Sequence, residues 1–157
     1  MKFNIPYSKP CYSKYDKKKI LSYVSDLDEN WFGEFRETRK LEENLSKVSG
    51  ANYVHAVNSG TSALICAFLS LGLKKNDEVL MTGYTHIATP NTAKLLGLNI
   101  RVIDIEKENS FADFNLIKKS LNKKIKCLVL AAINGRVSDS VFKICTLAKL
   151  KKIPIII

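Results

Sequence analysis

From Asn52 to the last residue, short apolar runs alternate with longer segments in which apolar residues recur three and four positions apart. The short runs have the length of β-strands, and the longer segments have the period of α-helices. This alternation is typical of β-α-β units arranged around a parallel sheet. It predicts an α/β fold with a mostly parallel sheet and flanking helices.

Five segments are predicted as strands: Tyr53–Val57, Glu78–Thr82, Ile100–Asp104, Ile125–Ala131 and Pro154–Ile157. Four segments between them are predicted as helices: Thr61–Leu71, Ile87–Leu96, Phe114–Leu121 and Asp139–Lys151. Because no linker or internal repeat interrupts this order, we expect residues 51–157 to form one domain.

The first 50 residues follow a different pattern, with amphipathic helices predicted at Lys17–Leu27 and Phe35–Val48 and a loop between them at residues 30–33. Ser49-Gly50 is a typical helix end, because glycine readily adopts the left-handed conformation that closes many helices. We expect residues 1–50 to form a helical arm laid on the domain.

Composition excludes several classes of protein. The chain of 157 residues is 46% hydrophobic and 25% charged, which is typical of a globular domain and not of a disordered one. The longest apolar run, Cys127–Ile133, is far shorter than the roughly 20 residues of a membrane-spanning helix. Since the amino end also lacks the apolar core of a secretory signal, we expect a cytoplasmic protein with no membrane partner.

The net charge of +10 comes mainly from lysine, because only four of the 25 basic residues are arginine. Arginine forms bidentate hydrogen bonds with phosphates and base edges, whereas scattered lysines give solubility and a diffuse attraction for anions. Nucleic acid is therefore not expected as a partner, and a basic nucleic-acid module is kept only as a remote alternative.

The cysteines give no sign of a metal site or of a redox motif. Their positions show no C-x-x-C spacing, and neither histidine has a cysteine nearby. Cys66, Cys127 and Cys145 lie inside apolar segments, so we expect them to be buried as small apolar side chains. No metal is expected.

The chain stops within the β-branched run Ile155–Ile157, which is of the kind buried on both faces of a parallel sheet. A free carboxylate at that depth is costly. Ligands of such folds also bind just beyond the carboxyl ends of the strands. We therefore expect a truncated or split protein whose domain is cut at its fifth strand.

Asn58-Ser59-Gly60-Thr61-Ser62 follows one predicted strand directly and opens a predicted helix. Such a turn presents unpaired backbone amides and small hydroxyls to one point, as a phosphate requires. The turn lacks the glycines of a dinucleotide fingerprint and the Gly-Lys-Ser/Thr of a P-loop. An ordinary Ser/Thr helix cap explains the same residues equally well.

Two further loops follow predicted strands. His86 is a candidate to stack on a flat cofactor, although a lone histidine is more often structural, and His55 is interpreted as a packed or hydrogen-bonded core residue. Asn134 and Arg136 are candidates to contact an anionic or sugar ligand, and a plain polar turn is an equally good interpretation. Ser138 is placed to cap the helix that follows.

The order of these motifs resembles the DegT/DnrJ/StrS aminotransferases, fold type I enzymes that use pyridoxal phosphate (PLP) to aminate keto sugars attached to nucleotides. The resemblance rests on these stretches: Ile5–Pro10, Gly50–Leu64, Asp77–Val79, Thr85–Asn91, Asn134-Gly135 and Ile153–Ile156. It implies a fold type I large-domain core, of which residues 51–157 are a part.

The resemblance also implies roles for individual residues. The turn Ser59-Gly60-Thr61-Ser62 would hold the cofactor phosphate, with Thr61 and Ser62 acting through backbone and hydroxyl. His86 falls where the family has an aromatic ring stacked on the pyridine, and Asn134 and Arg136 fall in a substrate loop. The partners implied are a nucleotide-linked keto sugar, an amino-acid amino donor and a second copy of the chain in a homodimer.

The family's aspartate for the pyridine nitrogen and its covalently bound lysine both have positions beyond Ile157. PLP chemistry needs both groups. We therefore expect no catalytic residue in this chain and no transamination by it alone. The function expected is the amino-terminal portion of a PLP-dependent aminotransferase for amino-sugar or cell-surface polysaccharide synthesis. A PLP-dependent sugar dehydratase of the same family and a non-catalytic sugar-nucleotide or phosphate-binding remnant stay open as alternatives.

Overall fold

The computed structural model describes residues 10–25 and 36–157, and the loop predicted at residues 30–33 lies outside them. The chain forms two compact units, Met1–Ala56 and Val57–Ile157. The second unit contains the sheet and the predicted phosphate turn, so it is the unit that bears on function.

A parallel sheet of four strands forms the centre of the second unit. The strands are β1 (Glu78–Thr82), β2 (Asn99–Ile103), β3 (Ile125–Val129) and β4 (Ile155–Ile156), in the order β2-β1-β3-β4. Every pairing is parallel, and at the carboxyl ends Thr82 lies beside Ile103 and Val129 beside Ile156. The predicted parallel α/β fold is confirmed, with β1 and β3 as the inner strands.

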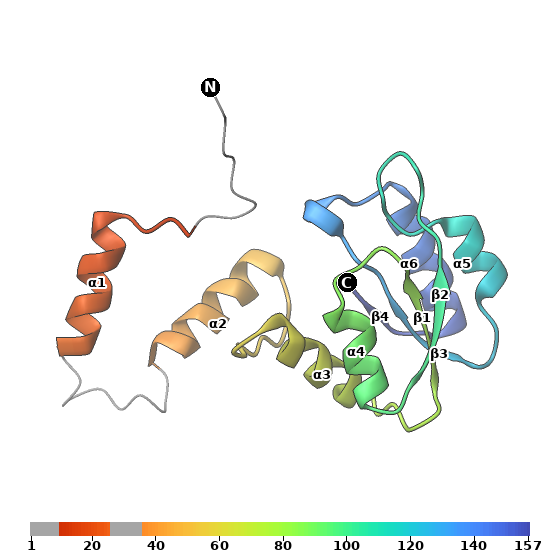
Figure 1. Cartoon of the computed structure of the whole chain (residues 1–157), viewed down its shortest axis with the longest axis horizontal. Helices are drawn as coiled ribbons and strands as arrows, with labels where there is room; N and C mark the ends of the chain where they lie inside the picture. Colours follow the sequence, from red (N-terminus) through yellow and green to blue (C-terminus); the bar gives the residue numbers. More distant parts are fainter. Residues whose placement is uncertain (1–9, 26–35) are drawn as a thin grey trace, which may run out of the picture. The chain divides into compact units, whose positions relative to one another are not determined.

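Four helices cover the two faces of this sheet. They are α3 (Gly60–Ser70), α4 (Ala88–Leu95), α5 (Phe114–Ser120) and α6 (Ser140–Lys151). Helices α3 and α4 lie on one face, and α5 and α6 lie on the other (Figure 1). Each begins and ends within one residue of its predicted bounds, because the helical period of apolar residues is a local signal.

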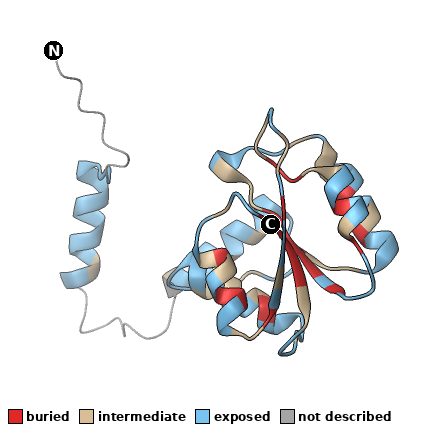
Figure 2. Ribbon diagram, turned by 45° about the vertical axis from the view of Figure 1, so that its right-hand side comes forward, coloured by how far each residue is buried: buried red, intermediate tan, exposed pale blue. Residues whose placement is uncertain are grey.

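The core lies on both sides of the sheet, because successive strand residues point to opposite faces. Val79 and Met81 of β1 pack with Phe68 of α3, whereas Leu80 packs with Phe111 and Ile144 on the other side. Figure 2 shows the buried residues along the strands and on the inward sides of the helices.

The strand predicted at Tyr53–Val57 is not formed. This segment pairs with no strand among the described residues, and Tyr53 is 88% exposed. The amide of Ala56 donates instead to Glu42 Oε1 at 2.8 Å. A strand needs a neighbour for its backbone hydrogen bonds, so the apolar alternation was not sufficient to make one.

Two other expectations were also wrong. Cys127 is buried, but Cys66 and Cys145 are exposed on α3 and α6. His55 is not a core residue, because 87% of its side chain is exposed. It lies 4.0 Å from Glu42 Oε1, measured from Nδ1.

The first unit contains α1 (Lys14–Ser25) and α2 (Arg36–Ser49). Ser13 and Asp16 cap α1 reciprocally, since Ser13 Oγ accepts from the Asp16 amide and Asp16 Oδ2 accepts from the Ser13 amide. Gly50 ends α2 with φ of +72°, which confirms the predicted helix end. Among the described residues, no helix is long and apolar enough to cross a membrane.

Candidate functional site at the carboxyl edge of the sheet

The four parallel strands of the second unit end at one edge, and the loops that follow them meet there. Helices α4 and α6 begin at this edge because they follow β1 and β3. Helix α3 runs into β1 through a short turn, so its amino end lies at the same edge. The predicted phosphate turn and the loops of His86 and Asn134 therefore share one edge of the sheet.

Ser59 caps the amino end of α3. Its backbone is extended, with φ −161° and ψ 158°, and its hydroxyl accepts from the Ser62 amide at 3.1 Å. Its carbonyl accepts from the Ala63 amide at 3.0 Å, which is the first hydrogen bond within the helix. The amides of Gly60 and Thr61 come before these two donors in the chain, and they have no partner among the described residues.

The hydroxyls of the turn divide into two groups. Ser62 Oγ donates to Asn58 Oδ1 at 2.7 Å and lies 3.0 Å from Ser59 Oγ, so both serine hydroxyls hold the turn together. Thr61 is exposed, and its hydroxyl has no partner in the described part of the chain. Asn58 thus has a positioning role that its place in the motif did not reveal.

The turn fits a phosphate by its donors and by the space around it. Gly60 and Thr61 are exposed, and a Cβ built at Gly60 would meet no atom within 4 Å, so there is space beside the turn. The first turn of α3 carries no acidic residue, and the positive end of the helix dipole favours an anion there. Two amides, one hydroxyl and this dipole form the donor set that a phosphate group requires.

His86 lies in the loop between β1 and α4, where it is exposed. Its Nδ1 accepts from the Ala88 amide at 3.1 Å, and its carbonyl accepts from the Thr89 amide at 2.9 Å. Nδ1 is thereby occupied as an acceptor. The imidazole therefore has a structural role at the start of α4, while its Nε2 has no partner among the described residues.

Asn134 and Arg136 follow β3 in the short 3-10 helix η1 (Ile133–Gly135) and its end. Asn134 has a left-handed backbone, with φ 55° and ψ 28°, and both side chains are exposed. Arg136 contacts no carboxylate among residues 10–25 and 36–157, so its charge is available to an anion. Ser138 Oγ accepts from the Ser140 amide at 3.1 Å, but the cap residue of α6 is Asp139, whose side chain makes no capping hydrogen bond, so Ser138 is not the predicted cap.

Two polar residues near this edge had no recognisable signal in the sequence. Burial by itself raises the pKa of Glu106, but hydrogen bonds from Asn109, Ser140 and Ser138 outweigh burial and lower it. Thr82 ends β1 with a buried hydroxyl that has no hydrogen-bond partner in the part of the chain described. No group of three or more potential metal ligands occurs among the described residues.

Comparison with known proteins identifies the family. The family model of the DegT/DnrJ/EryC1/StrS aminotransferases matches residues 14–157. UDP-2-acetamido-2-deoxy-3-oxo-D-glucuronate aminotransferase of Pseudomonas aeruginosa is 30% identical over 103 residues, which are 66% of this chain and 29% of that protein. UDP-4-amino-4-deoxy-L-arabinose–oxoglutarate aminotransferase of Shewanella sediminis is 26% identical over 146 residues, which are 93% of this chain and 37% of that protein.

A solved structure agrees with these relatives. NtdA of Bacillus subtilis, with its bound cofactor PMP, superposes with a TM-score of 0.84 at 25% identity. The match covers 91% of this chain and 33% of NtdA, so the chain spans about a third of the length of its relatives. The sheet of the second unit is accordingly part of a fold type I core, and the chain belongs to the DegT/DnrJ/EryC1/StrS aminotransferase family.

Proposed function

We propose that this chain carries the phosphate-binding part of a PLP site in an aminotransferase that acts on nucleotide-linked keto sugars. The observation that carries the proposal is the pair of amides at the exposed residues Gly60 and Thr61, which have no partner among the described residues. The names of the relatives, which are aminotransferases of UDP-linked sugars, support the substrate class. An amino acid would be the amino donor, and the product would serve amino-sugar or surface-polysaccharide synthesis in the cytoplasm.

The residues of this chain have distinct tasks in that site. The Gly60 and Thr61 amides and the Thr61 hydroxyl would bind the phosphate, while Ser59, Ser62 and Asn58 keep the turn in shape. We assign His86 to the pyridine ring, because its imidazole is oriented by the Ala88 amide and is exposed at the same edge. When bound, PLP supplies an electron sink for the reacting carbon.

We assign Asn134 and Arg136 to the sugar nucleotide. Arg136 is an exposed guanidinium at the end of η1, and a guanidinium binds phosphate oxygens in a bidentate way. The exposed amide of Asn134 offers a donor and an acceptor to sugar hydroxyls.

The family resemblance assigns none of the 21 lysines to the covalent role in the reaction. We therefore propose that these 157 residues bind the cofactor phosphate without turnover. Borohydride reduction after incubation with PLP should label lysines diffusely, at several positions and with low yield. Stoichiometric labelling of a single lysine, together with transamination, would contradict this proposal.

A homodimer completes the proposal. Helix α1 exposes Ile20, Leu21 and Val24, with 53%, 68% and 50% of their surfaces accessible. These apolar side chains lie within four positions of one another on the helix, so they form a surface that a second copy of the chain can cover.

The phosphate turn is tested by comparing Gly60→Asp with Gly60→Ala. Because a Cβ at Gly60 meets no atom within 4 Å, both side chains fit, and only aspartate adds a negative charge where the anion binds. Pyridoxamine phosphate is the probe, because it has no aldehyde to react with the lysines. We expect Gly60→Asp to weaken its binding at least tenfold and Gly60→Ala to change it less than threefold.

Pyridoxamine without phosphate serves as the ligand control, and titration calorimetry measures both ligands. The native chain should bind pyridoxamine phosphate much more tightly than pyridoxamine. If Gly60→Asp leaves the affinity unchanged, the phosphate does not bind at this turn.

A further inference from the structure

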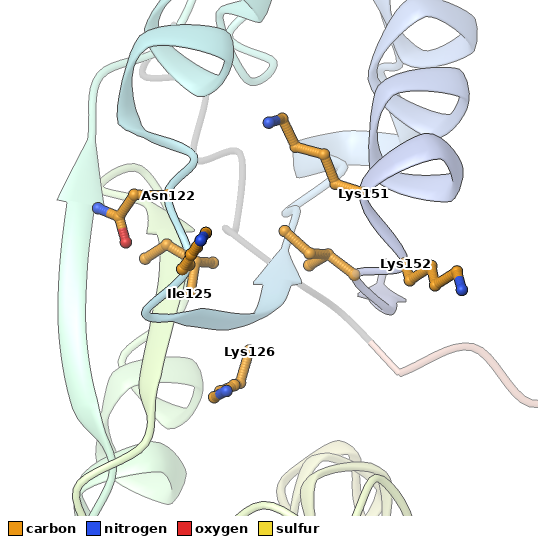
Figure 3. Close-up of a pocket in the computed structure, with 7 residues that line it drawn as sticks. Asn122, Ile125, Lys126, Lys151 and Lys152 are labelled. Carbon is orange, nitrogen blue, oxygen red and sulfur yellow. The ribbon is translucent and has the colours of Figure 1, made fainter.

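A second anion-attracting feature lies at the opposite edge of the sheet. The turn before β3, the start of β3 and the end of α6 enclose a pocket of about 400 Å³ (Figure 3). Ile125 and Ile153 contribute its apolar lining. The pocket lies where β3 begins, so it is separate from the phosphate turn, which lies at the edge where the strands end.

The polar lining of this pocket has charge of one sign only. It consists of Lys123, Lys126, Lys151 and Lys152, together with the amide of Asn122. All four lysines are exposed, and none of them forms an ion pair with an acidic residue in the described part of the chain. Figure 3 shows Lys126, Lys151 and Lys152 around the pocket, each on a different side.

The end of α6 does not cancel this positive charge. A helix carboxyl end is equivalent to about half a negative charge, which is small against four ammonium groups. Two of its carbonyls are also occupied, because Ala148 accepts from the Ile153 amide at 2.9 Å and Lys149 accepts from the Lys152 amide at 3.1 Å. A hollow lined by charge of one sign, with apolar walls, concentrates its field on a bound counter-ion.

We propose that this pocket binds a condensed phosphate, either as the free inorganic ion or as the phosphate chain of a nucleotide. Four flexible ammonium groups around one hollow match several anionic oxygens held close together, and lysine binds phosphate as a point charge. The volume falls in the range of small-molecule sites, about 300–1,000 Å³. A concave site of this size with no arginine is a poor match for the backbone of a duplex.

The test measures binding of inorganic tripolyphosphate to the whole chain by titration calorimetry. Lys126→Gln combined with Lys151→Gln removes two charges from the pocket. Lys118→Gln combined with Lys143→Gln is the matched control, because it removes two exposed lysines from α5 and α6 outside the pocket. We expect the pocket variant to lose at least tenfold in affinity and the control to change less than twofold.

A second measurement needs no substitution. Tripolyphosphate should protect Lys123, Lys126, Lys151 and Lys152 from an amine-acetylating reagent and leave Lys118 and Lys143 reactive. Equal losses in both variants, or equal protection of all six lysines, would show that only net charge attracts the ion and would overturn the proposal. Absence of saturable binding at millimolar tripolyphosphate would overturn it as well, and so would displacement of the ion by duplex DNA at equal phosphate concentration.

Gly60→Asp keeps the two sites distinguishable. It should not change tripolyphosphate binding to the lysine pocket, whereas it should weaken binding of pyridoxamine phosphate at the turn at least tenfold. A chain that fails one of these two tests can still pass the other.

Discussion

Cys127 lies in β3, and its side chain is fully buried beside Val79 and Phe68. Burial raises the pKa of its thiol from 9.0 to about 12, because the thiolate would lose its hydration. The thiol therefore contributes its full stabilisation below pH 9, where it is protonated in both the folded and the unfolded chain. Its contribution is lost as the pH rises from about 9 towards 12, since only the unfolded chain ionises readily there.

We expect Cys127→Ala to flatten the alkaline loss of stability. In the native protein, the raised pKa of Cys127 accounts for a decline of at most about 4 kcal/mol in the free energy of unfolding at high pH. Urea unfolding of the native protein and the variant between pH 7 and pH 11 gives the slope of unfolding free energy against pH for each. The small cavity left by alanine lowers stability equally at every pH and does not affect the slope. Identical slopes above pH 9 would mean that Cys127 is accessible to water in the folded state.

The reactivity of the other thiols provides an internal control. Cys11, Cys66 and Cys145 are exposed, so they should react with maleimide in the native protein at pH 8. Cys127 should react only after unfolding. The apolar neighbours in the sequence did not distinguish these cysteines, because α3 and α6 each carry apolar residues on more than one side.

The amino end of α6 depends on a carboxylate from a distant loop. Glu106 receives hydrogen bonds from Ser138 and Ser140 at this helix end, and from Asn109 within its own loop. The pKa of Glu106 is lowered, so its contribution to stability is present above pH 4.5 and is lost as the pH falls through the pKa of the folded state. A carboxylate at a helix amino end stabilises by about 0.5 kcal/mol.

Glu106→Gln should therefore reduce the free energy of unfolding at pH 7 by about that amount, and the difference should vanish near pH 3. Glu108→Gln is the control, because Glu108 is an exposed carboxylate of the same loop. Chemical unfolding at both pH values gives the comparison. A loss that is equal at pH 7 and pH 3 would show that the carboxylate charge is not what stabilises α6.

The contrast between α3 and the segment Tyr53–Val57 shows what local sequence can predict. The bounds of α3 and its Ser59 cap follow from spacing along one stretch of chain, and both were predicted correctly to within a residue. A strand instead requires a neighbour in space, and Tyr53–Val57 has none among the described residues. The same limit applies to the phosphate turn, since only the geometry shows that Ser62 Oγ is bonded to Asn58 while the Thr61 hydroxyl is free.

The two units should differ in stability, because the buried core is concentrated in the second. Helix α1 has no buried residue, and an isolated helix of 12 residues is marginal in water. The strands β1 and β3 are buried from end to end apart from Glu78 and Lys126. We expect amide hydrogen exchange at micromolar concentration to be fast throughout α1 and slowest in β1 and β3.

Exchange in α1 also tests the proposed homodimer. If a second copy covers Ile20, Leu21 and Val24, the protection of α1 should increase with protein concentration, because association stabilises the form that is bound. Protection of β1 should not depend on concentration, since the strand lies within one copy, and it serves as the control. Mass spectrometry at several concentrations follows both segments together. Fast exchange of α1 at every concentration would mean that this apolar surface stays exposed, and a homodimer would then have to form through another face.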